Sequence, residues 1–489
     1  MKDKLFNLLR ENLYHPVRAR VAYDFVIAFS SITFSYIIIS PTRINFFIIV
    51  FFPIIFTAIN LAIGFYSNLK YILSWQKSLL LLLSSVLSFI ILTATGSEVS
   101  PLLNASVYLV LLTSIPRLLL NFLISPVNEG HINQLITSDA PILVIGGGGY
   151  IGSTLVDKLL KNNFRVRVLD KFIYGEEVFD NLKNDKRLEI IKGDATNLSI
   201  LTLALRNAKA VVHLAGIVGD PASMVDDKLT RHMNIISTRM IKETVKGFRI
   251  PKFIFASSCS VYGASDNILT ERSKLNPLSP YAKSKIDSER EIMQDTFDEF
   301  HPTILRFATV FGHSKKPRFD LVLNLFAALA YNNKTIKVNG GNQWRPFVHV
   351  TDAADAIIKV IDAPTNKVSR KIFNVGDDSL NITIMVAANI VQSVFKKNGK
   401  NVKIIVRKGD LDFRNYIVSF QKIKEQLGFS CQISIEEGIS EIAKHFKKRT
   451  YKKPYTDSYY SALETTKEIK REFYSKGYRK THFLDFSLS

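Results

Sequence analysis

The sequence predicts an α/β fold, with a Rossmann-type doubly wound parallel sheet and a smaller α/β substrate domain, preceded by an all-α transmembrane domain of four helices. Three observations support this prediction. Apolar runs of helical length are concentrated before residue 125. From about residue 141, short apolar runs alternate with helical patterns, which is typical of parallel βαβ units. The first of these runs leads directly into a glycine-rich turn.

The length and charge of the chain narrow the functional classes. At 489 residues the chain exceeds one typical domain, so we expect two or three units. Its formal net charge is +21, and basic residues are dense before residue 22 and after Lys444. Because no nucleic-acid-binding motif is present, this charge favours an anionic membrane surface and an anionic substrate over nucleic acid. The two cysteines, Cys259 and Cys431, provide neither a disulfide framework nor a metal site.

Four apolar stretches precede residue 125, at 22–40, 44–66, 78–95 and 102–124. Each reaches the roughly 18–20 residues that a helix needs to cross a bilayer. Lys70 and Lys77 mark the second connection as cytoplasmic, like the basic N-terminal stub. We therefore expect a protein integral to the cytoplasmic (inner) membrane, with four spans, membrane lipids as partners and the remaining chain in the cytoplasm. Burial of the four stretches in a soluble helical core is the weaker alternative.

These patterns divide the chain into successive segments. They are a cytoplasmic N-terminal stub (1–21), the four-helix transmembrane domain (22–124), a polar linker (125–140), a dinucleotide-binding Rossmann domain (141–312), a substrate-binding region with returning Rossmann elements (313–447) and a basic C-terminal tail (448–489). The tail is also rich in tyrosine. Its composition is typical of an amphipathic or partly disordered extension, which could touch the bilayer.

The glycine-rich turn follows the apolar run 142–145 and precedes a helical pattern. Gly146, Gly149 and Gly152 give the spacing GxxGxxG instead of GxGxxG. Strand, glycine turn and helix in this order bring backbone N–H groups and the positive end of the helix dipole to a pyrophosphate. A glycine run alone could be a plain turn, so the residues that follow decide its meaning.

An acidic residue ends the next predicted strand, about twenty positions after the glycines. This residue, Asp170, can accept hydrogen bonds from the ribose hydroxyls and would repel a 2′-phosphate, which favours NAD over NADP. Asp194 follows a third strand and is expected near the adenine, and Ala215 follows a fourth strand and leaves room for the cofactor backbone. For His213, in that fourth strand, we favour a buried core histidine over a catalytic base.

A serine-rich loop and a Tyr-x-x-x-Lys pair supply the candidate catalytic group. Ser258 ends a buried strand, and Tyr281 and Lys285 lie one turn apart on the same face of a predicted helix. A lysine ammonium and a positive nicotinamide can lower the pKa of a tyrosine from about 10 toward neutrality, which makes it a base for an alcohol proton. The serine hydroxyl would hold the developing carbonyl oxygen. The alternative is a solvated helix face.

These motifs occur in the order that is typical of one enzyme family. The stretch from about 141 to about 447 resembles the extended short-chain dehydrogenase/reductase family of NAD-dependent sugar-nucleotide epimerases and dehydratases. Its motifs are most similar to those of UDP-galactose 4-epimerases. The resemblance implies a catalytic triad of Ser258, Tyr281 and Lys285. It implies NAD contacts at Gly146, Gly149, Tyr150, Ile151, Gly152, Asp170, Asp194, Ala215 and Lys285. It implies substrate contacts at Asn324, Arg345, Arg407 and Asp410, and no metal.

Two residues after the candidate serine bear on the reaction. Dehydratases of this family carry Asp-Glu there, and epimerases acting at C3 or C5 carry a cysteine at the second position, whereas this chain has Cys259 and Ser260. The resemblance therefore implies chemistry at C4 alone, which favours a membrane-anchored sugar-nucleotide 4-epimerase in polysaccharide or glycan biosynthesis. An NAD(P)-dependent C4 reductase or dehydrogenase remains an alternative, and a non-catalytic NAD-binding membrane scaffold is another.

The expected partner is a nucleotide-diphosphate sugar or a polyprenyl-diphosphate-linked sugar, since both present the same sugar-diphosphate end. Relatives in this family often pair through a four-helix interface. The helix after Tyr281 could supply half of one, so a homodimer is compatible with the sequence.

Overall fold

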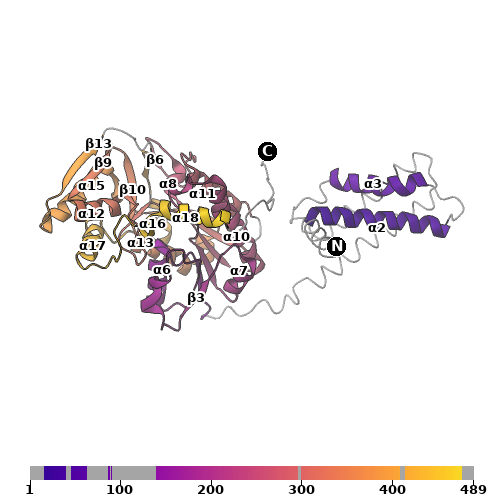
Figure 1. Cartoon of the computed structure of the whole chain (residues 1–489), viewed down its shortest axis with the longest axis horizontal. Coiled ribbons are helices and arrows are strands. Elements are labelled where there is room, and N and C mark those ends of the chain that lie inside the picture. Colours follow the sequence, from indigo (N-terminus) through magenta and orange to yellow (C-terminus); the bar gives the residue numbers. More distant parts are fainter. Residues whose placement is uncertain are drawn as a thin grey trace. The chain divides into compact units, whose positions relative to one another are not determined.

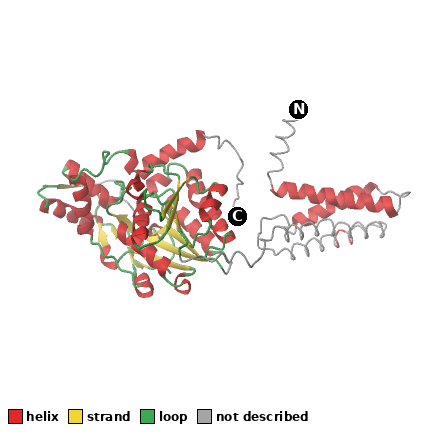
Figure 2. Cartoon of the chain, turned by 90° about the horizontal axis from the view of Figure 1, so that it is seen from below, coloured by secondary structure: helices red, strands yellow, loops and turns green. Residues whose placement is uncertain are grey.

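The computed structural model describes residues 16–39, 46–62, 86, 88, 90, 139–295, 299–407 and 414–475. The chain divides into two compact units, Met1–Gln134 and Leu135–Ser489, which we describe separately. Figure 1 labels their elements, and Figure 2 distinguishes helices from strands.

In the first unit, helices α2 (Pro16–Ile39) and α3 (Phe46–Ala62) pack together. Their contact is a cluster of buried apolar side chains: Ala28, Ile32, Tyr36, Ile48, Ile49, Phe52 and Phe56. The expected spans at 78–95 and 102–124 lie outside the described residues, apart from 86, 88 and 90.

The prediction that this protein lies in the membrane is wrong, because the described helices lack the length and hydropathy that a span requires. Within the described part of the chain, the structure contains no helix that is both long enough and apolar enough to cross a bilayer. In α2 the first turns carry Arg18, Arg20 and Asp24, which leaves an uncharged stretch shorter than the roughly 20 residues required. Helix α3 has 17 residues and contains Pro53.

The second unit contains a seven-stranded sheet with the strand order β11-β7-β5-β4-β1-β2-β3. All its strands are parallel, which confirms the predicted Rossmann-type sheet. The strands are β1 (Ile142–Ile145), β2 (Val166–Asp170), β3 (Leu188–Lys192), β4 (Ala210–His213), β5 (Lys252–Ser258), β7 (His301–Phe307) and β11 (Lys371–Val375).

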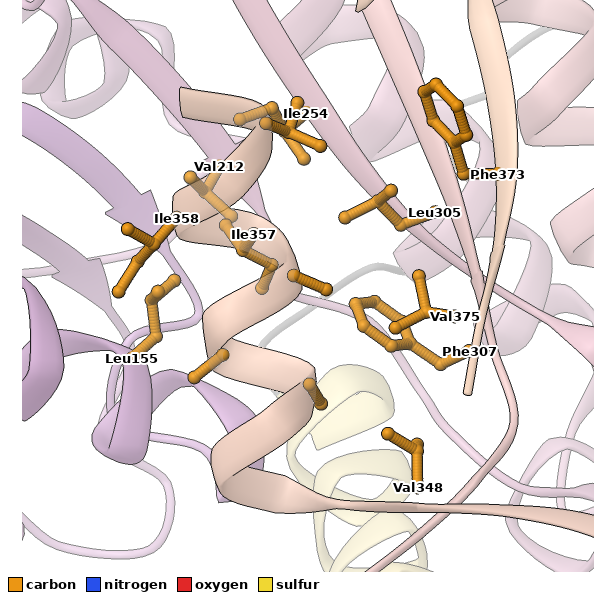
Figure 3. Packing of buried hydrophobic residues seen from close by; sticks show 14 of the residues in the cluster. Leu155, Val212, Ile254, Leu305, Phe307, Val348, Ile357, Ile358, Phe373 and Val375 are labelled. Atoms are coloured by element: carbon orange, nitrogen blue, oxygen red, sulfur yellow. The ribbon is translucent and has the colours of Figure 1, made fainter. Parts of the chain in front are cut away.

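Helices cover both faces of this sheet. Successive side chains of a strand point to opposite faces, so Ile142 and Val144 of β1 pack with α6 (Tyr150–Lys161) and α13 (Val350–Asp362). Leu143 and Ile145 pack instead with α7 (Leu198–Leu205), α10 (Ser237–Gly247) and α11 (Pro280–Met293). Figure 3 shows Leu155 of α6 and Ile357 of α13 in the first of these cores, beside strand residues such as Leu305. Burial on both faces explains why the central strands β1 and β4 are almost wholly apolar.

The remaining elements of this unit include a sheet β12-β10-β8, the strand pairs β13-β9 and β14-β6, and three helices that share one apolar core. The strands are β6 (Ile268–Leu269), β8 (Thr309–Phe311), β9 (Thr335–Asn339), β10 (Trp344–His349), β12 (Asn381–Thr383), β13 (Lys403–Arg407) and β14 (Ile417–Val418), and the helices are α12 (Val322–Asn333), α15 (Ile384–Lys397) and α17 (Ile435–Lys447).

The predicted basic tail is structured over much of its length. After α17 come a short turn of 3-10 helix, η5 (Ser458–Tyr460), and helix α18 (Ala462–Ser475), which is drawn in yellow in Figure 1. Helix α18 packs against α8 (Asp220–Ser223), so the tail folds back onto the segment that follows β4. Residues 476–489 lie outside the described residues.

Candidate active site

The glycine turn connects β1 to α6 at the carboxyl edge of the sheet. Gly146 has a φ of +84°, and a Cβ added there would lie 2.6 Å from the backbone nitrogen of Ala215. A Cβ on Gly152 would lie 2.3 Å from the carbonyl oxygen of Gly146. Gly149 precedes the first turn of α6, where backbone N–H groups have no partner within the helix. The three glycines therefore allow close backbone approach and leave donors for a pyrophosphate.

Two acidic residues flank this turn. Asp170 ends β2, and its carboxylate accepts hydrogen bonds from the N–H groups of Gly148 (2.8 Å) and Phe172 (2.8 Å). Burial raises the pKa of the Asp170 carboxyl, although these two donors act in the opposite direction. Asp194 forms an ion pair with Lys171 at 2.9 Å. Burial acts to raise the pKa of Asp194, but hydrogen bonds from Lys171 and Thr196 outweigh it, and this pKa is lowered.

Tyr281 and Lys285 lie in the first half of α11. The helix begins after Ser279, whose Oγ accepts a hydrogen bond from the N–H of Ala282 at 3.2 Å, and Pro280 occupies the first turn. Ser258 ends β5, its Oγ accepts a hydrogen bond from the N–H of Ser260 at 3.2 Å, and its side chain is near enough to Tyr281 to lower the pKa of that phenol. The ammonium of Lys285 donates to the carbonyl oxygen of Ala256 at 2.7 Å. The structure thus brings the predicted catalytic group together.

Burial dominates the protonation of this group. It raises the pKa of Tyr281 to about 12, with Asp220 acting in the same direction and Arg318 and the Ser258 hydroxyl acting against it. Burial also lowers the pKa of Lys285 to about 8, against the influence of Glu289. The influences that lower the pKa of Tyr281 in this structure come from Arg318 and Ser258, while Lys285 Nζ lies 5.9 Å from the centre of the Tyr281 ring. The expected lowering by Lys285 together with a bound nicotinamide stays a prediction.

A single cavity of about 330 Å³ contains both motifs. Every residue predicted for catalysis or for NAD lines it: Gly146, Gly149, Tyr150, Ile151, Gly152, Asp170, Asp194, Ala215, Ser258, Tyr281 and Lys285. The cavity offers a glycine cradle at one helix terminus and a carboxylate at the end of β2, as a dinucleotide requires. The residues present therefore fit NAD.

The predicted substrate contacts are distributed differently. Asn324 and Arg345 are buried but do not line the cavity. The Asn324 side chain accepts from the N–H of Gly312 at 2.9 Å and donates to the carbonyl of Arg318 at 2.9 Å, so it orders the loop that carries Arg318. Arg345 donates to the carbonyl oxygens of Trp344 and Arg414.

The remaining two predicted substrate contacts are Arg407 and Asp410. Arg407 is exposed at the end of β13 and does not line the cavity, and Asp410 lies outside the described residues. Contacts of these four residues with a substrate therefore stay a prediction.

Three charged residues that the sequence pattern did not reveal line the cavity near Tyr281: Asp220, Arg318 and Arg414. Asp220 binds Arg414 at 2.5 Å and accepts the Ser279 hydroxyl at 2.6 Å. Arg318 binds Asp320 at 2.8 Å. These residues lie far apart in the sequence, so no local pattern groups them. Asp220 alone could have been proposed from the sequence, because the acidic residue in Gly219-Asp220-Pro221 follows shortly after β4.

Asn234 is another residue of structural importance to the site that the sequence pattern did not reveal. It lies in one turn of π-helix, His232–Ile236, and its side-chain amide donates to Ile217 O at 3.0 Å and to Ser284 Oγ at 2.9 Å. It therefore joins the segment after β4 to α11, the helix that carries Tyr281.

The two residues after Ser258 differ in exposure to the cavity. The Cys259 thiol is buried and donates to the carbonyl of Arg306 at 3.2 Å, and burial raises its pKa. Cys259 therefore packs, as expected. Ser260 lines the cavity.

Comparison with known proteins identifies relatives of this unit. Residues 142–376 match the model of the NAD dependent epimerase/dehydratase family. The UDP-glucuronate 4-epimerase of Thermodesulfobacterium geofontis is 28% identical over 310 residues, which are 61% of this chain and 93% of that protein. The uncharacterized UDP-glucose epimerase YtcB of Bacillus subtilis is 32% identical over 236 residues, or 46% of this chain and 73% of that protein. The dTDP-D-glucose 4,6-dehydratase of Homo sapiens is 26% identical over 321 residues, or 63% of this chain and 89% of that protein.

A solved structure of an epimerase is also similar to this unit. The UDP-glucuronic acid 4-epimerase from Bacillus cereus, in complex with UDP-glucuronic acid and NAD, superimposes with a TM-score of 0.57 and 25% sequence identity. The match covers 63% of this chain and 99% of that one.

Proposed function

The chain belongs to the NAD-dependent epimerase/dehydratase family, and we propose that this enzyme is a sugar-nucleotide 4-epimerase. The observation that carries the proposal is the grouping of Ser258, Tyr281 and Lys285 in the cavity that also contains the glycine turn. A hydride acceptor and a proton acceptor would then act on the same secondary alcohol of the sugar, the first at its carbon and the second at its hydroxyl group. In this proposal Gly146, Gly149, Gly152, Asp170 and Asp194 hold NAD.

Tyr281 would take the proton of the sugar 4-hydroxyl on its Oη, and would give it back after the 4-keto intermediate has turned over. The Ser258 hydroxyl, which lines the same cavity as Tyr281, would donate to the developing carbonyl oxygen. Lys285 is held by Ala256 beneath the tyrosine and adds positive charge when protonated. When bound, NAD supplies the hydride acceptor and a positively charged ring, which favours ionisation of a neighbouring phenol.

Two features favour chemistry at C4 over 4,6-dehydration. Cys259 and Ser260 occupy the positions where an acid/base pair would stand, and neither is a carboxylate. Of the described residues that line the cavity, the carboxylates are Asp170, Asp194 and Asp220. The first two lie at the glycine turn, and Asp220 is already paired with Arg414 and Ser279.

The charge of the cavity suits a sugar diphosphate. Arg318 and Arg414 are the guanidinium groups that line it near Tyr281, and planar guanidinium groups bind phosphate oxygens through paired hydrogen bonds. The relatives are named for UDP- and dTDP-sugars, so we propose a nucleoside-diphosphate sugar with a pyrimidine base as substrate.

The proposal is tested by incubating purified enzyme with UDP-glucose, UDP-galactose, UDP-glucuronate and dTDP-glucose without added cofactor, followed by chromatography of the sugar nucleotides. We expect the C4 epimer of at least one substrate. Strict dependence on added NADH or NADPH would favour the C4 reductase, and a 4-keto-6-deoxy product would identify a dehydratase. Absence of turnover in an enzyme that contains NAD would favour a non-catalytic scaffold.

A further inference from the structure

The C-terminal residues 451–475, which we term the strap, contribute a wall of the active-site cavity. Ala462, Thr466 and Ile469 of α18 line the same cavity as Gly146 and Tyr281. The strap lies outside the part of the chain that the family model matches, 142–376. It therefore adds a boundary to the cavity that the family motifs do not supply.

One end of the strap is attached beside the loop that follows Asp170. The Lys316 ammonium lies 4.0 Å from the ring centres of both Tyr174 and Tyr459, so it joins a residue of that loop to the strap. Lys316 also donates to the carbonyl oxygen of Tyr459. Lys316 is buried, at 2% exposure, which excludes water from this junction, and burial lowers the pKa of its ammonium to about 7.

A second attachment reaches the cavity itself. The N–H of Ala462 donates to Asp320 Oδ2 at 2.9 Å, and the same carboxylate binds Arg318 at 2.8 Å. The start of α18 is thus held by the ion pair that also orients a cavity-lining guanidinium.

The other end of α18 is attached to the segment that follows β4. Lys470 forms an ion pair with Asp226 at 3.1 Å and donates to the carbonyl of Val225 at 3.1 Å. The hydroxyl of Tyr474 donates to Asp226 Oδ2 at 3.1 Å. Apolar side chains complete this contact and form one small core: Ile217, Ala222, Leu229, Ala462, with Val218, Met233, Ile469 and Phe473 packed on it.

These attachments lie on two sides of the dinucleotide site. Tyr174 follows β2 and its ribose-binding Asp170, whereas residues 217–229 follow β4 and Ala215, which faces Gly146. The strap is thus joined to both segments, and its residues Ala462, Thr466 and Ile469 line the cavity that contains the glycine turn. We propose that the strap encloses bound NAD and slows its release, so that the cofactor is retained through many turnovers.

The proposal depends on NAD as the cofactor and not on which sugar reaction follows. It is tested by loading the full-length protein with NAD labelled in the adenine ring, adding excess unlabelled NAD, and measuring the label that remains bound with time. The variant Lys470→Ala/Phe473→Ala loosens the strap without changing a residue that lines the cavity. The matched control is Lys467→Ala, since Lys467 lies on the same helix in an exposed pair with Glu464.

We expect the double variant to release NAD at least about ten times faster than both the control and the unaltered protein, while turnover at saturating NAD stays within about twofold. Release at the control's rate would overturn the proposal. Hydrogen exchange on the unaltered protein provides an independent measurement that does not require the variant to fold. Amides of α18 should exchange more slowly with NAD bound than after its removal, and equal exchange would also contradict the proposal.

Discussion

Glu289 and Arg306 form a buried bidentate ion pair, with Arg306 Nη2 2.6 Å from Glu289 Oε2 and Arg306 Nε 3.0 Å from Glu289 Oε1. Glu289 also accepts the Ser257 hydroxyl at 2.5 Å. Because Glu289 lies one turn after Lys285 and Ser257 precedes Ser258, this pair connects α11 to β5 and β7 directly behind the catalytic group. It therefore fixes the distance between the two elements that carry Tyr281 and Ser258.

Replacement of Glu289 by alanine should strongly destabilise the protein. The change leaves the Arg306 guanidinium buried without its carboxylate, and removing one partner of a buried ion pair typically costs about 3–5 kcal/mol. Urea denaturation measures the free energy of unfolding. Arg290→Ala, on the exposed side of the same helix, is the control and should change it by less than about 0.5 kcal/mol. A loss below about 1 kcal/mol for Glu289→Ala would show that the pair does not hold these elements together.

Replacement of Gly152 by alanine should abolish tight NAD binding. The new Cβ would lie 2.3 Å from the carbonyl oxygen of Gly146 and 2.7 Å from Gly147 Cα, so the glycine turn must move away from the geometry that a pyrophosphate needs. Calorimetric titration with NAD should give a dissociation constant raised at least about tenfold. Gly247→Ala is the control, because a Cβ there meets nothing within 4 Å. Unchanged affinity in Gly152→Ala would exclude this turn as the cofactor site.

His213 should make the protein less stable as the pH falls. It is buried, and burial, with Lys285, lowers its pKa to about 3. Below about pH 6.5 the unfolded chain binds a proton at this imidazole and the folded protein does not, so the free energy of unfolding decreases on acidification toward pH 3. In His213→Asn this slope should be shallower by up to about 1.4 kcal/mol per pH unit. Urea denaturation between pH 6.5 and 4.5 measures it, and identical slopes would contradict a neutral buried histidine.

Replacement of Tyr281 by phenylalanine should lower turnover by about 10²–10⁴-fold, because the variant lacks the group that takes the alcohol proton. Bound NAD, measured after denaturation of the purified protein, should be unchanged. Tyr455→Phe serves as the control, since its hydroxyl contacts exposed Asn333 at 3.3 Å. Full activity in Tyr281→Phe would refute the assigned role of the tyrosine.

The parts of the site that could be predicted from sequence are those encoded locally. The run 142–145, the glycines after it and Asp170 form a strand–turn–helix–strand unit whose geometry follows from turn chemistry and burial, and Tyr281 and Lys285 share a helix face by spacing alone. Asp220, Arg318 and Arg414 meet only because distant segments fold together, and no local pattern encodes that approach. The same holds for α18, because the basic composition of this segment suggested an amphipathic or partly disordered extension.

Composition alone reports neither the partners of a residue nor the length of a helix. Arg345 lies in an apolar run and its guanidinium donates to two main-chain carbonyls, while its expected contact with a diphosphate stays a prediction. The apolar runs before residue 125 were long enough by residue count, whereas none of the described helices meets the length and hydropathy needed to span a bilayer.

The fate of the hydrogen at C4 tests the proposed epimerase most directly. Sugar nucleotide deuterated at C4 is incubated with the enzyme and no added cofactor, and substrate and product are analysed by mass spectrometry and NMR. The account predicts that the C4 epimer keeps its deuterium at C4 and that none appears in free NADH or in water. Deuterium found in released NADH, or moved to C6 of a 4-keto-6-deoxy sugar, would contradict it.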